Sequence, residues 1–186
     1  MLKNTQTEKN ILTAFAGESQ ARNRYTYFAS VANKEGYREI SEAFLEIANQ
    51  EKEHAKRLFK LLEGGEVEIT AKYPAGKIGA TIENLKASIG GENYENTIMY
   101  PEFSKIAKEE GFPKIAEVLS AIAVAEIYHE KRFKDFLQNI ENKKVFEKDS
   151  EVIWCCINCG YNYKGKKAPE KCPACDHAQK HFKSLG

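Results

Sequence analysis

Apolar residues recur at every third or fourth position along most of the chain, which is the spacing of one buried helix face. The pattern predicts helices over residues 5–33, 37–63, 80–110 and 113–142. Gly36, Gly64 and Gly111 mark three of the helix ends. The connection from Gly64 to Gly79 is long for neighbouring antiparallel helices, so we expect it to cross between two helix pairs.

Two of these apolar stripes are interrupted by polar residues at core positions. Glu51 and His54 fall on the stripe of the second helix, and Glu126 and His129 fall on that of the fourth. A buried carboxylate without a partner is costly, so such residues are normally paired, hydrogen-bonded or bound to metal. A compensating partner is therefore expected beside both Glu-x-x-His pairs.

The chain contains an internal duplication of a helix pair. The two Glu-x-x-His pairs are 75 residues apart. The segment EGYREISEAF at 35–44 matches EGFPKIAEVL at 110–119, and Tyr25 matches Tyr100 at the same spacing. Each half is thus expected to contribute similar residues to one shared core.

Each half also places a glutamate on the apolar stripe of its first helix. Glu18 and Glu92 are the matching positions, 74 residues apart. Glu95 is additional, because its counterpart in the first half is Ala21. The second half therefore carries an extra carboxylate, and the site need not be symmetric.

The third helix contains residues that disfavour a regular helix. Gly90, Gly91 and Pro101 predict weakening or a kink between Glu92 and Tyr100. The extra carboxylate lies in this segment.

Composition and charge narrow the class of protein. The 186 residues include 28 basic and 27 acidic side chains, for a net charge of +1. Basic charge is not clustered as nucleic-acid binding requires. No apolar run approaches the length of a membrane helix, and the opening residues lack the apolar core of a secretion signal. We expect a cytoplasmic protein that binds neither nucleic acid nor membrane.

All five cysteines follow Ile153, and four of them form two C-x-x-C pairs. In a cytosolic protein such pairs indicate a metal site rather than disulfides. The four thiolates predict a tetrahedral sulfur site for iron or zinc, made by Cys156, Cys159, Cys172 and Cys175. Cys155 is extra and is interpreted as a non-ligand.

The change in composition predicts two domains and a linker. We expect a helical bundle at residues 1–142, a linker at 143–150 and a small metal-binding module at 151–186.

Inward-facing glutamates on four helices, two of them in Glu-x-x-His pairs, form the pattern of a ferritin-like bundle with a two-metal carboxylate site. A single Glu-x-x-His would more often lie on a solvated face, but two in register on the core stripe favour metal. The candidate ligands are Glu18, Glu51, His54, Glu92, Glu95, Glu126 and His129.

The spacing leaves the role of two tyrosines open. Tyr25 and Tyr100 lie about two turns along their helices from the glutamates of the first and third helices, so their hydroxyl groups could reach the metal pocket. The alternative is two core tyrosines with ordinary hydrogen-bond partners. Glutamates off the stripe, Glu130 among them, are interpreted as solvated.

The chain resembles the rubrerythrin family along nearly its whole length. The segments GES, EKEH, GENYENTIMYPEF and AEIYHEK are similar to the family's di-iron motifs in order and spacing, and CINCGY with APEKCPAC resembles its rubredoxin-like domain. The resemblance implies a mainly α fold, a ferritin-like four-helix bundle followed by a small rubredoxin-like β module.

The resemblance also implies roles for individual residues. Glu51 and Glu126 would bridge two irons, and Glu18 would bind the first iron terminally. Glu92 and His129 would bind the second iron. His54 and Glu95 would exchange at the first iron with redox state, and Tyr25 and Tyr100 match tyrosines of the family's catalytic pocket.

The implied activity is a non-haem peroxidase that reduces hydrogen peroxide to water in oxidative stress defence. Electrons would pass from one iron in the Fe(Cys)4 centre to two non-haem irons, supplied by NADH through an upstream reductase or a rubredoxin-type donor. Zinc can substitute for iron at either site. The resemblance also implies a homodimer or higher homo-oligomer.

Two other functions are consistent with the sequence. A ferroxidase or iron-storage protein uses the same bundle, although storage does not require the cysteine module. A structural bundle with a zinc-ribbon interaction module is the second alternative. The metals loaded, the reductant and the role of Cys155 are not determined by the residues.

Overall fold

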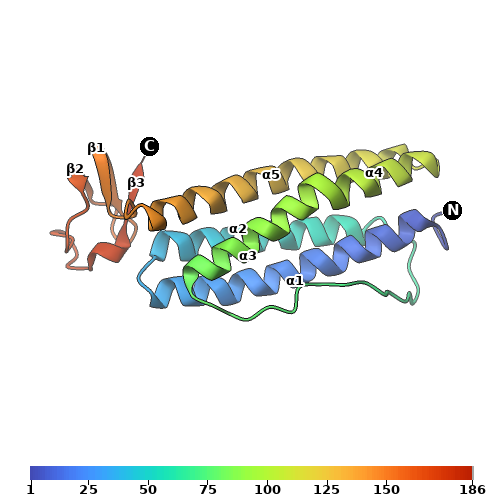
Figure 1. Ribbon diagram of the computed structural model, residues 1–186, viewed down its shortest axis with the longest axis horizontal. Coiled ribbons are helices and arrows are strands. Elements are labelled where there is room, and N and C mark those ends of the chain that lie inside the picture. The colour runs from blue at the N-terminus through green and yellow to red at the C-terminus, as the bar shows by residue number, and fades with distance from the viewer. Residues whose placement is uncertain (186) are drawn as a thin grey trace.

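The computed structural model describes residues 1–185, which form a long helical bundle with a small β module at one end (Figure 1). The helices are α1 (Gln6–Lys34), α2 (Arg38–Phe59), α3 (Thr81–Tyr94), α4 (Tyr100–Glu109) and α5 (Pro113–Glu141). A short π-helical turn, η1 (Glu95–Met99), joins α3 to α4, so these elements form one continuous segment. The bundle therefore has four helical segments, and the predicted fold class is confirmed.

The helix ends follow from local sequence. The hydroxyl of Thr5 accepts a hydrogen bond from the Glu8 amide and caps α1. Pro113 occupies the first turn of α5, where its missing N–H is not needed. The duplicated residues Gly36 and Gly111 have φ values of +88° and +85°, a left-handed conformation that ends α1 and α4 in the same way.

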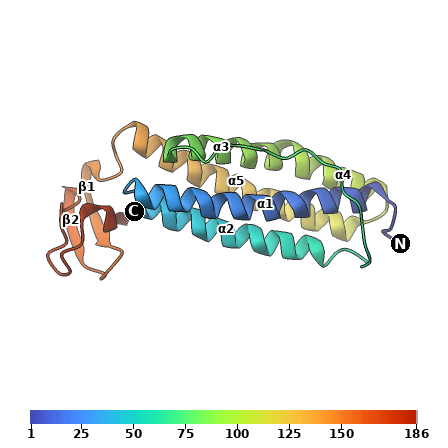
Figure 2. The ribbon, with the colours of Figure 1, turned by 90° about the horizontal axis from the view of Figure 1, so that it is seen from below.

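The connection between α2 and α3 begins earlier in the chain than predicted. Helix α2 ends at Phe59 rather than near residue 63. The chain then runs beside α1 along the bundle, from one end to the other, before α3 begins (Figures 1 and 2). Tyr73 donates to the Thr13 carbonyl at 2.9 Å, and Gln20 donates to the Pro74 carbonyl at 2.8 Å. The predicted crossover is thus present and is held against α1.

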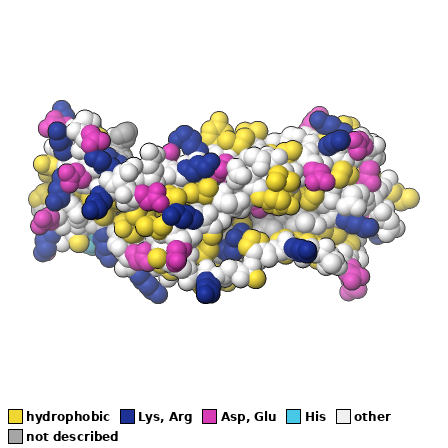
Figure 3. Space-filling view, viewed as in Figure 1, with side chains coloured by type: hydrophobic (Ala, Val, Ile, Leu, Met, Phe, Trp, Pro, Cys, Tyr) yellow, Lys and Arg dark blue, Asp and Glu magenta, His cyan; other side chains and the backbone are white. Residues whose placement is uncertain are grey.

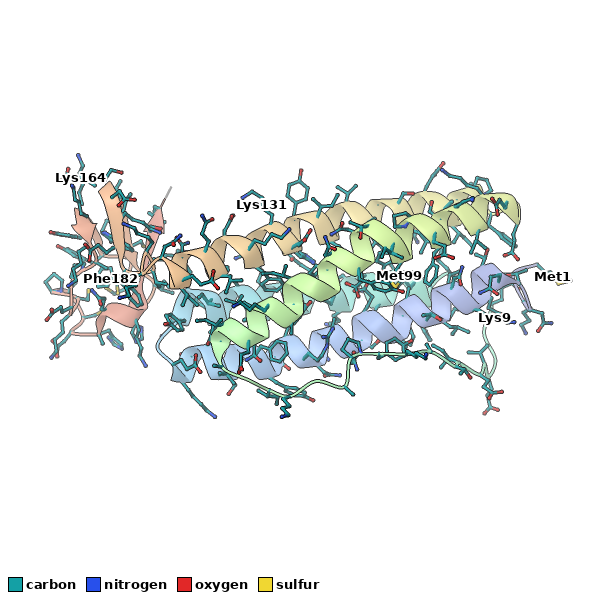
Figure 4. The ribbon with its side chains drawn as sticks, viewed as in Figure 1. Met1, Lys9, Met99, Lys131, Lys164 and Phe182 are labelled. Atoms are coloured by element: carbon teal, nitrogen blue, oxygen red, sulfur yellow. The ribbon has the colours of Figure 1, made fainter. Side chains whose placement is uncertain are left out.

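The bundle core consists of two apolar clusters. One includes Tyr25, Phe44 and Phe133 and lies toward the β module, with Tyr25 and Phe133 in an edge-to-face contact at 5.3 Å. The other includes Tyr100 and Met99, and Figure 4 shows Met99 directed into the bundle. The glutamates and histidines predicted from the stripes lie along the helices between these clusters, where Glu18, Glu51, Glu92 and Glu126 are buried.

The β module contains β1 (Glu147–Cys156), β2 (Asn162–Lys167) and β3 (Phe182–Leu185), in the sheet order β2-β1-β3. The indole of Trp154 is buried and donates to the Gly165 carbonyl at 3.0 Å. Strand β1 begins inside the stretch predicted as a linker, because Glu147 pairs with Lys167. A short 3-10 turn, η2 (Gln179–His181), lies against α2.

None of the helices within residues 1–185 combines the length and apolar character needed to cross a bilayer. Basic and acidic side chains are interspersed on the face shown in Figure 3.

Candidate metal centres

The structure brings six of the seven predicted bundle ligands together in two groups that share Glu51 and Glu126. Within each group, one ligand atom from every residue lies within 4.8 Å of the others. The first group adds Glu18 and His54, and the second adds Glu92 and His129. Two adjoining sites that share two carboxylates are suited to a pair of divalent cations.

Each imidazole directs its Nδ1 atom toward both shared carboxylates. Nδ1 of His54 lies 3.0 Å from an oxygen of Glu51 and 3.0 Å from one of Glu126. Nδ1 of His129 lies 3.0 Å and 2.7 Å from the other oxygens of the same two residues. The two glutamates therefore present one oxygen to each half of the site.

The donor atoms fit bound cations. Six buried atoms of this set have no hydrogen-bond partner among the described residues: Oε2 of Glu18, Oε1 of Glu51, Oε2 of Glu92, both carboxylate oxygens of Glu126 and Nδ1 of His129. Carboxylates buried this deeply require a positive charge nearby. Two divalent cations would satisfy all of these atoms at once.

The burial of these carboxylates also shifts the pKa values of the residues at the site. Burial, followed by the charge of Glu51, raises the pKa of Glu18 to about 8. Burial lowers the pKa of His129, but its contacts with Glu126 and Glu51 raise it to about 12. Protons and metal ions are alternative ways of neutralising these carboxylates, and a metal ion would leave the imidazole nitrogens free as ligands.

The two tyrosines connect the halves of the duplication. Tyr25 donates its hydroxyl hydrogen to Glu92, and Tyr100 donates to Glu18. Both tyrosines are fully buried. Each tyrosine thus contacts a glutamate from the other half of the duplication, so both hydroxyl groups lie within reach of the site.

Glu95 lies beside the two groups rather than inside them. It opens the π-helical turn η1 and is partly buried. Its pKa is raised well above the usual range by burial and then by the charges of Glu18 and Glu92. His54 and not Glu95 completes the first group in this structure.

The π-helical turn accounts for the change of spacing within the duplication. Glu18 and Glu92 are 74 residues apart, whereas Tyr25 and Tyr100 are 75 apart, so the second half contains one more residue between them. A π-helical turn accommodates one additional residue in a continuous helix. The weakening predicted around Gly90, Gly91 and Pro101 takes this form.

The prediction that Glu130 is solvated is wrong. Its side chain is buried and accepts hydrogen bonds from Asn93 at 3.0 Å and Asn96 at 3.1 Å, with Lys134 at 2.6 Å. These partners lie on α3, η1 and the next turn of α5. The duplication offered one signal for this residue: the counterpart of Glu130 in the first half is Ala55, so the two halves differ at this position.

Sequence reasoning also did not identify Gln50. Its Oε1 atom lies 3.0 Å from Nε2 of His129, the ring nitrogen that faces away from the carboxylates. Gln50 lies on the exposed side of α2, off the apolar stripe, and nothing in the spacing distinguishes it.

The four predicted cysteines form the second centre. Their sulfur atoms lie within 4.8 Å of one another, with Cys156 and Cys175 at 3.7 Å and Cys159 and Cys172 at 3.6 Å. The His177 backbone amide donates to Cys175 and, with smaller contributions from the neighbouring thiols, lowers its pKa to about 6. Four sulfur ligands in this arrangement fit iron or zinc, and Cys155 lies outside the group.

Comparison with family models gives two matches. A rubrerythrin model matches residues 9–137, and a model of the rubredoxin-like domain of rubrerythrin matches residues 154–183. The first region contains all seven bundle residues and the second all four cysteines.

Similar proteins match along nearly the whole chain. Rubrerythrin of Nitratidesulfovibrio vulgaris is 58% identical, covering 100% of this chain and 97% of the relative. Rubrerythrin of Porphyromonas gingivalis is 55% identical over 99% of this chain and 92% of the relative.

Solved structures show the same architecture. Nigerythrin in its fully reduced, all-ferrous state matches with a TM-score of 0.65 and 30% identity, covering 100% of this chain and 92% of that one. Bacterioferritin BfrA of Mycobacterium tuberculosis has a TM-score of 0.65 over 76% of this chain and 90% of its own, at 17% identity, and shares the bundle fold.

Proposed function

Because the chain belongs to the rubrerythrin family, we propose that it is a non-haem di-iron peroxidase that reduces hydrogen peroxide to two water molecules. The reaction consumes two electrons and two protons, and the electrons enter through iron in the four-cysteine centre. The observation that supports this proposal is the presence in one chain of a shared-carboxylate site and a four-sulfur site.

The bundle residues would hold two irons. Glu51 and Glu126 would bridge them, Glu18 and His54 would complete the first position, and Glu92 with His129 would complete the second. Two ferrous ions at this site would supply one electron each to the O–O bond of peroxide.

The surrounding residues would orient the ligands and supply protons. Tyr25 and Tyr100 hold Glu92 and Glu18 through buried hydrogen bonds, so these carboxylates are fixed before substrate binds. Their hydroxyl groups lie at the site and can pass protons toward the departing oxygens. Both tyrosines belong to the apolar clusters of the core and are fully buried.

His54 and Glu95 would alternate as ligands of the first position. The carboxylate is the harder ligand and suits the ferric state, whereas the neutral imidazole tolerates the ferrous state. The presence of Glu95 beside the site, where the other half has Ala21, supports this proposal. Structures of the oxidised and reduced protein with the same side chain bound at this position would contradict it.

The reductant is proposed to be a rubredoxin-type protein that is itself reduced by an NADH-dependent enzyme. A homo-oligomer is part of the same proposal, because the β module lies at one end of the bundle and could serve a neighbouring chain (Figure 1).

Steady-state peroxide consumption with a protein electron donor tests the proposal. Cys159→Ser or Cys172→Ser should abolish turnover while leaving the chemically reduced bundle able to react with peroxide. Cys155→Ser is the matched control, since this thiol lies outside the sulfur group, and should turn over normally.

Unchanged turnover in the Cys159 and Cys172 variants would overturn the role of the module as an electron inlet. A colourless wild-type protein with zinc in the sulfur site would favour the zinc-ribbon alternative.

A further inference from the structure

The two histidines of the bundle site differ in how they are held. Nδ1 of His129 faces the shared carboxylates, so this is the nitrogen available to a metal ion. Nε2 then carries the hydrogen and donates to Oε1 of Gln50 at 3.0 Å. A hydrogen bond at the second ring nitrogen fixes the tautomer and orientation of a ligating histidine.

His54 lacks such a partner. Its Nδ1 faces the same carboxylates, but within residues 1–185 no protein group is hydrogen-bonded to its Nε2. Its side chain is also more accessible, at 17% exposed against 8% for His129. The His54 ring can therefore turn without losing a second hydrogen bond.

The duplication explains this difference. Gln50 directly precedes the first Glu-x-x-His pair, and Ala125 directly precedes the second. Gln50 on α2 reaches across to His129 on α5. The residue that would make the reciprocal contact from α5 to His54 is Ala125, whose methyl group accepts no hydrogen bond.

We propose that Gln50 is a positioning residue that fixes His129 at the second metal position. Ala125 makes no such contact with His54, so His54 is free to move away from the first metal position. This inference rests on the proposed two-metal function and adds the cause of inequivalence between the two histidines. It agrees with the presence of the extra carboxylate Glu95 in the second half, where the first half has Ala21.

Zinc binding to the full-length protein tests the proposal without reference to activity. The sulfur site is filled with zinc first, and the bundle site is then titrated with zinc in protein carrying ¹⁵N-labelled histidine. The two readouts are the affinities of the two bundle equivalents and the Nε2–H signals of His54 and His129.

Gln50→Ala makes residue 50 identical to its counterpart in the second half, Ala125. We expect it to remove the slowly exchanging Nε2–H signal of His129 and to weaken one zinc equivalent by about 10-fold, with the other unchanged. Gln50→Glu keeps an acceptor oxygen and should restore both properties. Because Gln50 is exposed, neither change should prevent folding.

Ala125→Gln is the reciprocal variant. It should give His54 a protected Nε2–H signal like that of His129. An unchanged His129 signal with unchanged zinc affinities in Gln50→Ala would overturn the proposal, as would equal weakening of both equivalents. Failure of the proposed function would be distinguishable, because wild-type protein would then bind fewer than two zinc ions in the bundle or show no peroxide turnover.

Discussion

At the scale of single residues, the bundle site depends on buried carboxylates whose charge must be neutralised by protons or by bound metal ions. Glu18, Glu51, Glu92 and Glu126 are each no more than 1% exposed. Glu51 and Glu126 contact both halves of the site, so their removal should affect both metal positions. Removal of a terminal residue should affect only one.

Glu126→Ala should therefore abolish metal binding in the bundle while the four-cysteine centre keeps its metal. Metal analysis of the purified variant measures this directly. Glu117→Ala is the matched control, because Glu117 lies exposed on the same helix, and should retain all metals. Two metal ions per bundle in Glu126→Ala would contradict the bridging role.

The residues on the apolar stripes were predictable because a polar side chain at a buried position must be compensated. Glu51, His54, Glu126 and His129 were found in this way, and the structure brings them together. Gln50 and Glu130 were not, because both lie off the stripes and their partners come from other helices. Their positions could be inferred only by asking where the two halves of the duplication differ.

At the scale of elements, the π-helical turn η1 is where the duplicated helix pairs differ in backbone. Periodicity predicted one helix over 80–110 and its composition indicated weakening, but neither specifies a π turn. The turn is stabilised by Glu130 of α5, which accepts hydrogen bonds from Asn96 in η1 and Asn93 in α3. Asn96 also donates to the Glu92 carbonyl at 2.7 Å.

Glu130→Ala should destabilise the protein by about 0.5–1.5 kcal/mol, because Asn93 and Asn96 lose the hydrogen bonds that they donate to its carboxylate. Amide hydrogen exchange should accelerate at residues 95–99 more than elsewhere in the bundle. Asp135→Ala removes an exposed ion pair with Lys131 on the same helix and should change stability little. Equal exchange rates at 95–99 in wild type and Glu130→Ala would refute this role.

At the scale of the whole molecule, the β module contacts the bundle through η2 and α2. Arg38 of α2 donates to Nδ1 of His181 at 2.9 Å, which requires a neutral imidazole. Burial, followed by the charge of Arg38, lowers the pKa of His181 below 6.5, with His177 and Lys180 adding to the effect and Glu42 opposing it. The division into two domains was predictable from the change in composition along the chain. The contact between Arg38 and His181 was not, because these residues are far apart in the sequence.

The contact should be sensitive to pH. A histidine with a lowered pKa in the folded protein contributes stability above its unfolded value of 6.5 and loses it as pH falls through the folded value. A double-mutant cycle with Arg38→Ala and His181→Ala should give a coupling energy of about 0.5–1.5 kcal/mol above pH 6.5. The coupling should vanish well below that pH, and a coupling that persists there would contradict the assignment.

Electron transfer from the sulfur centre to the bundle is the central claim, and a single turnover tests it most directly. Fully reduced, iron-loaded protein is mixed with hydrogen peroxide without oxygen, and the visible absorption of the ferric four-cysteine centre is followed. We predict rapid return of this absorption in wild type and little return in Glu126→Ala, whose bundle holds no metal. Return at the same rate in both proteins would show that peroxide oxidises the sulfur centre directly and would contradict the account.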